Sequence, residues 1–257
     1  MPLRFLRNGL FADKEKIMTL IKILKGSLEI LRVNWKMILF EYTTKTLLLA
    51  AIAVIIGTVI GAVLAFGNMS KIKPLKWVVV AIVEFIRGTP ALLQVYVIYF
   101  FVPMIIPAMN RMDPMISAFI CAAVALTLNS AAYVSEIIRS GIEAVDKGQT
   151  EAARSLGLNS TVTMTEIVLP QAVKNILPAL GNEFITVVKE TSLAATFFAG
   201  ELMTFYKEYV GVTHDALPAF IVVGLVYFVL NFVSILGFVD VYVLKSILII
   251  SSAFFGS

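Results

Sequence analysis

Apolar windows without a single charged residue recur along most of this chain and are separated by short polar connections. Four such windows are long enough to cross the hydrocarbon core of a bilayer as helices: 46–70, 88–110, 114–135 and 216–239. A fifth span is expected between Pro178 and Gly200, where three charged residues require the helix to face protein or water: Glu183, Lys189 and Glu190. The predicted spans are therefore about 46–69, 77–106, 115–138, 178–200 and 216–237.

The composition places the chain among membrane proteins. Of the 257 residues, 59% are hydrophobic and 15% are charged, and the mean hydropathy is +0.91, whereas a soluble domain is about 45–50% apolar and about 25% charged. A single cysteine, Cys121, and the high apolar content exclude disordered, collagenous and disulfide-rich classes. The sequence contains no zinc-ligand spacing, phosphate loop or nucleophile elbow. We therefore expect neither an enzyme nor a metal site, and the net charge of +4 does not indicate nucleic-acid binding.

The two ends of the chain differ from the spans. Residues 1–42 are predicted to form an amphipathic lead-in at the membrane interface, with a solvated helical lead-in as the plainer alternative. Apolar positions recur there at helical spacing between basic residues: Ile17, Leu20, Ile21, Leu24, Leu28 and Leu31. Residues 238–257 form an apolar tail that could prolong the last span, lie along the interface or contribute to a poor sixth span. Five spans are favoured.

Residues 139–176 form a polar loop in an otherwise apolar chain. Gly148 and Gly157 flank a short expected helix, and Gly157 stands where a left-handed cap costs least. Ser160 is expected to cap a second short helix, which Pro170 ends. A simple spacer would not need two capped helices, so this loop is predicted to dock another protein.

The spacing of residues in this loop resembles the EAA signature of the membrane subunits of bacterial ATP-binding-cassette (ABC) importers. The matching residues keep the spacing of that family: Glu151, Ala152 and Ala153, then Gly157, then Ile167–Pro170. In the family, the short coupling helix of the loop sits in a groove of the ATPase subunit. The resemblance implies an all-α, type I ABC importer transmembrane domain over residues 43–237, with about five transmembrane helices and a cytoplasmic EAA loop. It assigns coupling to five residues: Glu151, Ala152, Ala153, Gly157 and Leu158.

A second resemblance narrows the substrate class. Residues 84–94, 131–142 and 182–193 are similar to segments of the polar amino-acid permease subfamily. This implies a multi-pass permease subunit that imports polar amino acids across the bacterial cytoplasmic membrane. It also implies three kinds of partner: a second permease subunit, identical or related, two ABC ATPase subunits that carry ATP and Mg²⁺, and an extracytoplasmic amino-acid-binding protein. No cofactor is expected on this chain.

The charge distribution conflicts in one respect with the orientation that the resemblance implies. An extracellular N-terminus and five spans place the EAA loop in the cytoplasm. Nine of the 21 Lys and Arg residues lie within residues 1–45, however, and would then be outside, against the positive-inside bias. We give the loop more weight, because an EAA loop outside the cell could meet no ATPase.

Charged and polar residues within the spans are candidates for a substrate path, because they are costly in lipid unless they pair or line a cavity. Arg87 or Lys189 could bind the carboxylate of an amino acid, and Glu183 or Glu190 its ammonium. The full candidate set is Arg87, Thr89, Asn129, Tyr133, Ser135, Glu136, Glu183, Lys189, Glu190, Thr191 and Ser192. The alternative, given equal weight, is that these charges form structural ion pairs, as Glu84 and Arg87 can at a spacing of i,i+3.

Two other functions stay open from the sequence. An ion-coupled secondary amino-acid transporter would use the intramembrane carboxylates, although such folds often contain internal repeats and none is evident in this sequence. A membrane scaffold without a transport path would leave the same charges only a pairing role. His214, the single histidine, is expected to be a solvated loop residue.

Overall fold

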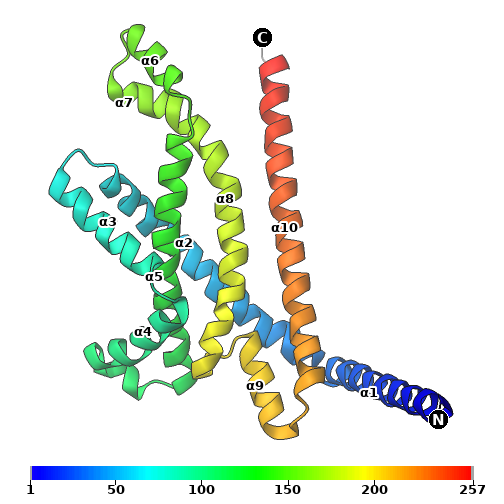
Figure 1. Cartoon of the computed structure of the whole chain (residues 1–257). Helices are drawn as coiled ribbons and strands as arrows, with labels where there is room; N and C mark the ends of the chain where they lie inside the picture. The colour runs from blue at the N-terminus through cyan, green and yellow to red at the C-terminus, as the bar shows by residue number, and fades with distance from the viewer. Residues whose placement is uncertain (1, 256–257) are drawn as a thin grey trace.

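The computed structural model describes the backbone of residues 2–255 and the side chains of residues 15–237, and every element in that part of the chain is a helix. An all-α fold is therefore confirmed. Four long helices form the bundle: α2 (Thr43–Asn68), α5 (Pro114–Glu143), α8 (Leu169–Glu190) and α10 (Ala216–Phe255). Figure 1 shows that α5, α8 and α10 run along the length of the molecule and that α2 crosses behind them.

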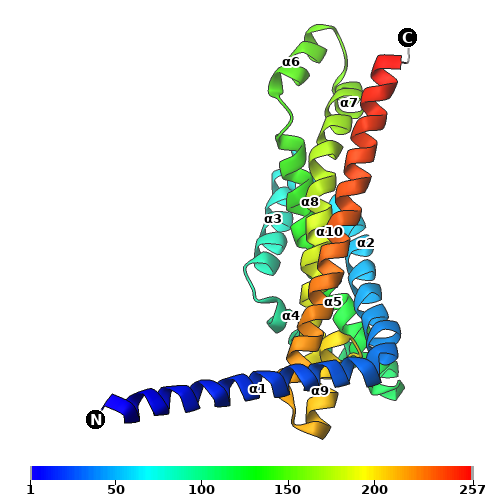
Figure 2. The same ribbon diagram turned by 90° about the vertical axis from the view of Figure 1, so that its right-hand side faces the viewer.

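Shorter elements mark the two ends of the bundle. The helix α6 (Lys147–Ser155) stands at one end, called the loop end below, and α9 (Leu202–Thr213) stands at the opposite end (Figure 1). The helix α1 (Pro2–Lys36) runs crosswise to α10 near that opposite end (Figure 2). It continues through a π-helical turn, Met37–Tyr42, into α2. The predicted lead-in is thus a helix that joins the first span without a break.

Three of the described helices are long and apolar enough to cross a membrane: Glu15–Asn68, Pro114–Glu143 and Ala216–Gly237. A bent helix pair, described next, adds a fourth crossing if it is taken as one span. The helix α8 is less apolar because it carries Glu183, Lys189 and Glu190. That this charged helix faces protein or water stays a prediction.

The predicted second span, 77–106, consists of two helices rather than one. The helices α3 (Lys73–Arg87) and α4 (Ala91–Ile105) meet at an angle of 104°. Pro90 between them has φ −60° and ψ 133°, and it has no N–H with which to continue the helical hydrogen bonds. A proline also disfavours the helical conformation of the residue before it. The break therefore follows from Pro90, but the bend is far larger than a proline kink within one helix.

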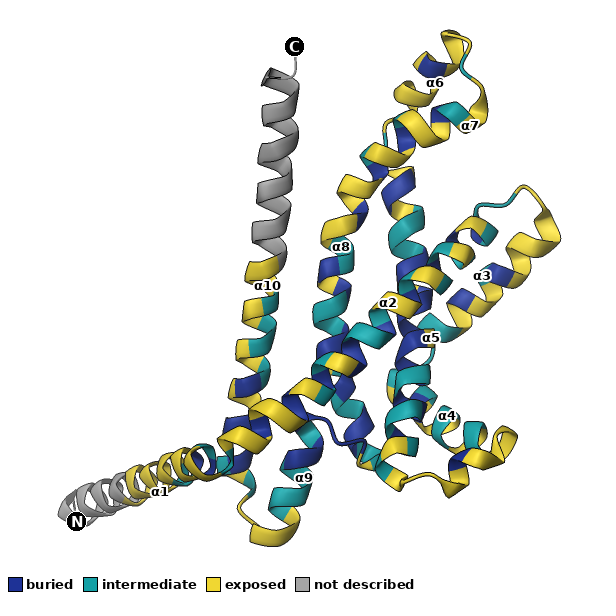
Figure 3. Cartoon of the chain, turned by 180° about the vertical axis from the view of Figure 1, so that it is seen from behind, coloured by how far each residue is buried: buried dark blue, intermediate teal, exposed yellow. Residues whose placement is uncertain are grey.

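Small residues allow α2 to approach α5 closely. A Cβ atom on Gly61 would lie 2.7 Å from the carbonyl oxygen of Ala131, and one on Gly57 would lie 3.1 Å from the Cβ of Ser130. The core between α2, α5 and α8 contains Leu49, Ala50, Ala53, Ala118, Ala122, Leu126, Val187 and Val188. Figure 3 shows the buried residues where these helices cross. Close contact matters here because lipid supplies no hydrophobic drive for helices to associate.

The chain from the loop to the end of α8 is one helical run, which differs from the sequence expectation. The short α7 (Ser160–Val162) passes through a π-helical turn, Thr163–Val168, into α8. Pro170 was expected to end a short helix, but it lies where the π-helical turn joins α8, and the helical run continues past its missing N–H. Pro178, expected at the entry to a span, lies inside α8. Prolines occur inside membrane helices because neighbouring groups satisfy the freed backbone atoms.

The C-terminal helix extends beyond the last predicted span. The helix α10 continues without a break through the predicted tail as far as Phe255. The tail is therefore continuous with the helix of the last span, and its place relative to the membrane stays a prediction. A 3₁₀ turn, Thr191–Phe197, and α9 connect α8 to the start of α10.

Candidate functional site

The loop that carries the predicted coupling residues stands at the loop end of the bundle (Figure 1). Its first helix, α6, begins after Asp146, whose carboxylate accepts a hydrogen bond of 2.6 Å from the N–H of Gly148. This side-chain acceptor satisfies a backbone donor that the first turn of a helix leaves free. The sequence expectation of a short capped helix over this part of the loop agrees with the structure.

The end of α6 is closed by Gly157, which has φ +85°. The N–H of Gly157 donates to the carbonyl of Arg154 at 3.0 Å, and the N–H of Leu158 donates to the carbonyl of Ala153 at 3.1 Å. This pair of bonds is the Schellman motif, in which a left-handed residue ends a helix and reverses the chain. The left-handed cap predicted at Gly157 is confirmed.

The second turn of the loop is capped by Asn159 rather than by Ser160. The side-chain oxygen of Asn159 accepts a hydrogen bond of 2.9 Å from the N–H of Val162. Asn and Ser are both good N-caps, so the backbone decides which of these adjacent residues caps the turn. Asn159 has the extended backbone that a cap requires, with ψ 165°, and the expectation for Ser160 is corrected.

The coupling residues divide into an outward set and an inward set. Glu151 and Ala152 are exposed, and Leu156 is 83% exposed. Ala153 is buried where α6 packs on the π-helical turn, and the carbonyl of Leu158 accepts a hydrogen bond of 3.0 Å from the guanidinium of Arg154. Leu156 is not among the predicted coupling residues, although its apolar side chain stands exposed in a polar loop.

Arg87 connects α3 to α5 by ion pairing. Its guanidinium lies 3.0 Å from the carboxylate of Glu84 on the same helix and 3.8 Å from that of Glu136 on α5. It also lies over the ring of Tyr133, at 5.7 Å from the ring centroid. Glu136 accepts a further hydrogen bond of 3.3 Å from the side chain of Asn68 on α2. The structure therefore brings three predicted path residues, Arg87, Tyr133 and Glu136, into one cluster.

Arg139 completes this charge network. It donates to Glu136 at 2.7 Å and to Glu143 at 2.6 Å. The i,i+3 pair expected from the sequence, Glu84 with Arg87, forms, and Glu136 pairs with Arg139 at the same spacing. Glu136 therefore has two cationic partners and an amide donor, so the loss of one of them does not leave its carboxylate without a partner.

Gln94 organises the break between α3 and α4. Its side-chain nitrogen donates to the carbonyl of Ile86 at 2.7 Å and to the carbonyl and hydroxyl of Thr89 at 3.2 and 2.9 Å. Its side-chain oxygen accepts a hydrogen bond of 3.0 Å from Asn129 on α5. Two predicted path residues, Thr89 and Asn129, are thus held together by a residue that was noted only as part of a motif. The carbonyl of Ile86, which lacks a donor from Pro90, is therefore bonded by Gln94.

Replacing Gln94 by leucine is expected to lower the thermal stability of the purified subunit in detergent. The change takes the acceptor from the buried side chain of Asn129 and one donor from the carbonyls of Ile86 and Thr89, although Ile86 keeps Thr89 as a donor. An unsatisfied buried group costs about 1–3 kcal/mol. A shift of the melting temperature by several degrees should follow. The matched control is Gln171→Leu, because Gln171 donates only to a carbonyl of its own helix, that of Ile167. Equal shifts for both variants would contradict this role of Gln94.

Glu183 is a separate buried site on α8. It is 7% exposed, and its carboxylate accepts a hydrogen bond of 2.9 Å from the hydroxyl of Ser130 on α5. Ser135, further along α5, is also buried, and its hydroxyl has no hydrogen-bond partner among the described residues. These side chains lie between helices, as expected for polar groups in a membrane protein.

The other predicted path residues lie at the end of α8. Lys189 is exposed and Glu190 is half-buried. The hydroxyls of Thr191 and Ser192 donate to carbonyls in the preceding turn, at 2.8 and 2.7 Å. The predicted path residues therefore form several separate groups in a single chain. These are the cluster around Arg87, the residues hydrogen-bonded to Gln94, Glu183, and the end of α8.

Glu201 is a buried acid in the connection between the predicted spans 178–200 and 216–237. It is fully buried, it caps α9 by accepting from the N–H groups of Met203 and Thr204 at 2.7 and 2.9 Å, and it accepts from the hydroxyl of Tyr227 on α10 at 3.0 Å. Burial raises the pKa of Glu201, and these hydrogen bonds oppose that shift. Glu201 thus ties α9 to α10.

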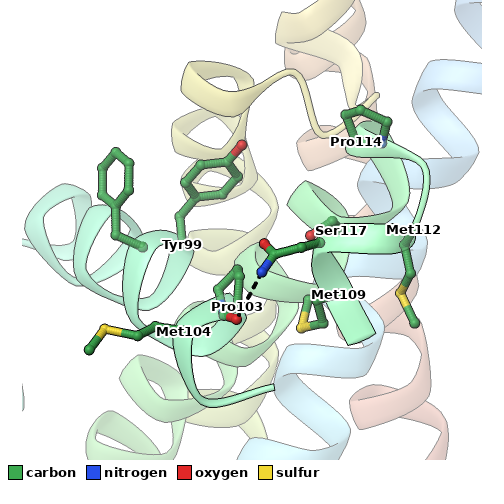
Figure 4. Close-up of a pocket in the computed structure, with 9 residues that line it drawn as sticks. Tyr99, Pro103, Met104, Met109, Met112, Pro114 and Ser117 are labelled. Atoms are coloured by element: carbon green, nitrogen blue, oxygen red, sulfur yellow. Dashed lines mark hydrogen bonds between the residues drawn. The ribbon is translucent and has the colours of Figure 1, made fainter. Parts of the chain in front are cut away.

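A surface pocket of about 440 Å³ lies near the opposite end of the bundle (Figure 4). It is lined by Tyr99, Phe100, Pro103, Met104, Met109, Asn110, Met112, Pro114 and Ser117. None of the predicted path residues lines it. Its aromatic and methionine lining offers no charged group for the carboxylate or the ammonium of an amino acid, so it does not serve as the predicted substrate site.

Comparison with known proteins places this geometry in a family. Residues 57–239, which are more than half of the chain, match the family described as the binding-protein-dependent transport system inner membrane component. The chain belongs to this family. It is 41% identical over 194 residues to the arginine transport system permease protein ArtQ of Bacillus subtilis (strain 168), with 76% of this chain and 85% of ArtQ covered. It is 43% identical over 163 residues to the putative glutamine transport system permease protein GlnP of Rickettsia bellii (strain RML369-C), with 63% and 72% covered.

Solved structures share the fold of this family member. The crystal structure of an amino acid ABC transporter with histidines has 40% sequence identity and a TM-score of 0.72, over 83% of this chain and 95% of the other. The inward-facing MetNI methionine ABC transporter has 20% identity and a TM-score of 0.63, over 83% and 94%, which shows a shared fold. The expected type I ABC importer transmembrane fold is therefore confirmed.

Proposed function

We propose that this chain is the permease subunit of an ATP-driven ABC importer that carries polar amino acids across the bacterial cytoplasmic membrane. The observation that carries the proposal is the exposed helix α6, closed by Gly157 at the loop end, in a member of a binding-protein-dependent transport family. The relatives support the substrate class, since ArtQ is named for arginine and GlnP for glutamine. Nothing in these relatives favours the ion-coupled alternative.

In this proposal the loop end faces the cytoplasm and docks on an ATPase subunit. Glu151, Ala152 and Leu156 form the contact surface, because they are exposed on one short helix and its cap. Two ATPase subunits bind and hydrolyse ATP with Mg²⁺, and this chain moves in response. A second permease subunit, identical or related, completes the path, and an extracytoplasmic amino-acid-binding protein delivers the solute at the opposite end. Rocking of the two permeases would then alternate access to the path.

We place the substrate path along the charged surfaces beside α5. Arg87 is the candidate for the amino-acid carboxylate, because its guanidinium is partly exposed while it is held by Glu84 and Glu136. Glu183 is the candidate for the ammonium, because its carboxylate is buried and accepts its hydrogen bond from a neutral group, Ser130. Lys189 and Glu190 remain candidates at the far end of α8.

The proposed function is tested by uptake of radiolabelled arginine and glutamine into vesicles that contain the chain with the ATPase purified alongside it. Uptake is expected to require ATP and a binding protein, and vanadate should block it. Proton and sodium ionophores should leave it unchanged. Uptake that resists vanadate and collapses with an ionophore would contradict the proposal and support the ion-coupled alternative.

A further inference from the structure

The helix α1 has three distinct faces between Glu15 and Lys36. One face packs on α10: the hydroxyl of Ser27 donates to the carbonyl of Pro218 at 3.2 Å, and Ile30 is buried in a cluster with Ala219 and Val222. Gly26 is also close, since a Cβ on it would lie 3.1 Å from the ring of Pro218. This face fixes how α1 is rotated about its own axis.

A second face of α1 is an apolar stripe that no other part of the described chain covers. At 100° per residue, the stripe is centred about 120° from the packed face. Its members have exposed fractions from 44% to 67%: Ile17, Leu20, Ile21, Leu24, Leu28 and Trp35. The neighbouring first turns of α10 also expose apolar side chains, including Leu217 at 60% and Phe220 at 47%. The stripe is therefore continuous with the outer surface of a span.

The third face is charged and predominantly basic. Its charged members are Lys22, Lys25, Glu29, Arg32 and Lys36, which are all exposed, and two apolar residues, Met18 and Val33, share it. This face is centred roughly 100° from the apolar stripe. Four cations against one carboxylate match a surface of phosphate groups.

The arrangement of the three faces gives the stripe a direction. In Figure 2, α1 passes in front of α10 with its N-terminus to the left. The packed face of α1 therefore points away from the viewer, toward α10. The residues of a right-handed helix advance clockwise when the helix is viewed from its N-terminus. The apolar stripe, 120° further round, therefore points toward the loop end, parallel to the spans. The charged face then points away from them. An amphipathic helix that lies in a membrane interface requires this arrangement.

We propose that α1 lies in the membrane interface at the end of the bundle opposite the loop, with its apolar stripe among the acyl chains and its basic face at anionic phospholipid headgroups. The occupant of the stripe is lipid because the stripe extends the lipid-facing surface of α10 and because the adjoining face is basic. The proposal needs only that the bundle spans a membrane, so it stands independently of the proposed transport function.

Spin labels on the full-length chain in vesicles test this placement. Each label sits on a single cysteine in a Cys121→Ala background, Cys121 being buried. Leu24→Cys and Leu28→Cys probe the stripe, and Lys22→Cys and Glu29→Cys are the matched controls on the charged face. Stripe labels should collide with oxygen, which is concentrated in lipid, and little with a water-soluble nickel chelate. The controls should show the reverse.

Two outcomes would overturn the lipid assignment. Stripe labels shielded from both reagents would mean that a protein, such as a receptor or a second copy, covers the stripe. Stripe labels that collide with the nickel chelate would mean that α1 lies in water.

The headgroup chemistry is tested in phosphatidylcholine vesicles with and without phosphatidylglycerol. The anionic lipid should bury the label at Leu24 more deeply. A variant with Lys22, Lys25, Arg32 and Lys36 changed to glutamine should lose that difference. A depth of the Leu24 label that does not change with the charge of the lipid would contradict the binding of α1 to anionic headgroups.

Discussion

ATP-driven uptake is expected to fall about tenfold when Gly157 is replaced by valine, while ATP hydrolysis by the partner continues. A Cβ on Gly157 would have nothing within 4 Å, so the substitution adds no clash. It strains only the backbone, which has φ +85° in a region that costs ordinary residues about 1–2 kcal/mol and β-branched residues more. Relief of that strain breaks the Schellman bonds and turns α6 relative to α7. The ratio of solute transported to ATP hydrolysed measures this uncoupling.

Two variants control for this result. A Cβ on Gly211 of α9 would likewise have nothing within 4 Å, but Gly211 has an ordinary helical backbone, so Gly211→Val should keep coupling. Gly157→Asn should retain much of it, because asparagine adopts the left-handed conformation more readily than other residues. Normal coupling in Gly157→Val, or an equal loss in Gly211→Val, would show that the loop does not transmit the ATPase motion.

Replacing Arg87 by glutamine is expected to weaken the apparent affinity for the amino acid tenfold or more, with the complex still assembled. A charge-assisted hydrogen bond contributes about 1.5–3 kcal/mol. Assembly should survive because Glu136 keeps Arg139 at 2.7 Å and Asn68 at 3.3 Å. The measurements are concentration-dependent uptake and the yield of permease with its ATPase. Glu84→Gln is the control, because Glu84 is the more exposed partner of Arg87.

A structural role for Arg87 predicts a different pattern. Arg87→Gln would then reduce assembly, and the double variant Arg87→Gln with Glu136→Gln would restore both assembly and uptake, since no charge would be left unpaired. Rescue by the second substitution would therefore contradict a direct contact between Arg87 and the solute.

Features of the fold that depend on one residue's own backbone were predictable from the sequence. Gly157 could be recognised as a cap because it follows a helix and tolerates positive φ. A lost helical hydrogen bond at Pro90 could be recognised because proline has no N–H, although the same loss at Pro178 does not end α8. The 104° bend could not, since its size depends on how α4 packs on α5 and how Gln94 bonds across the break.

Contacts between helices could not be predicted from the sequence. The spacing of Glu84 and Arg87 showed a possible pair within α3, but the contact from Arg87 to Glu136 needs α3 and α5 side by side. Glu201 lies in a connection between two predicted spans, yet it is fully buried, where it accepts hydrogen bonds from the first turn of α9 and from Tyr227. A buried carboxylate is stable only with such partners, and no pattern of spacing reveals them.

The uninterrupted run from Ser160 through α8 makes this part of the chain a lever. We place its pivot where α5 and α8 pack tightly, since a Cβ on Gly141 would lie 2.4 Å from the side chain of Ile176. The arm to Ser160 is about 24 Å and the arm to Glu183 about 10 Å, at 1.5 Å per residue. A push of about 3 Å on the loop would swing Glu183 the other way by about 1 Å, enough to stretch its 2.9 Å bond to Ser130 beyond hydrogen-bonding distance. A larger displacement of the loop would thus become a smaller displacement of Glu183, which makes or breaks its buried hydrogen bond to Ser130.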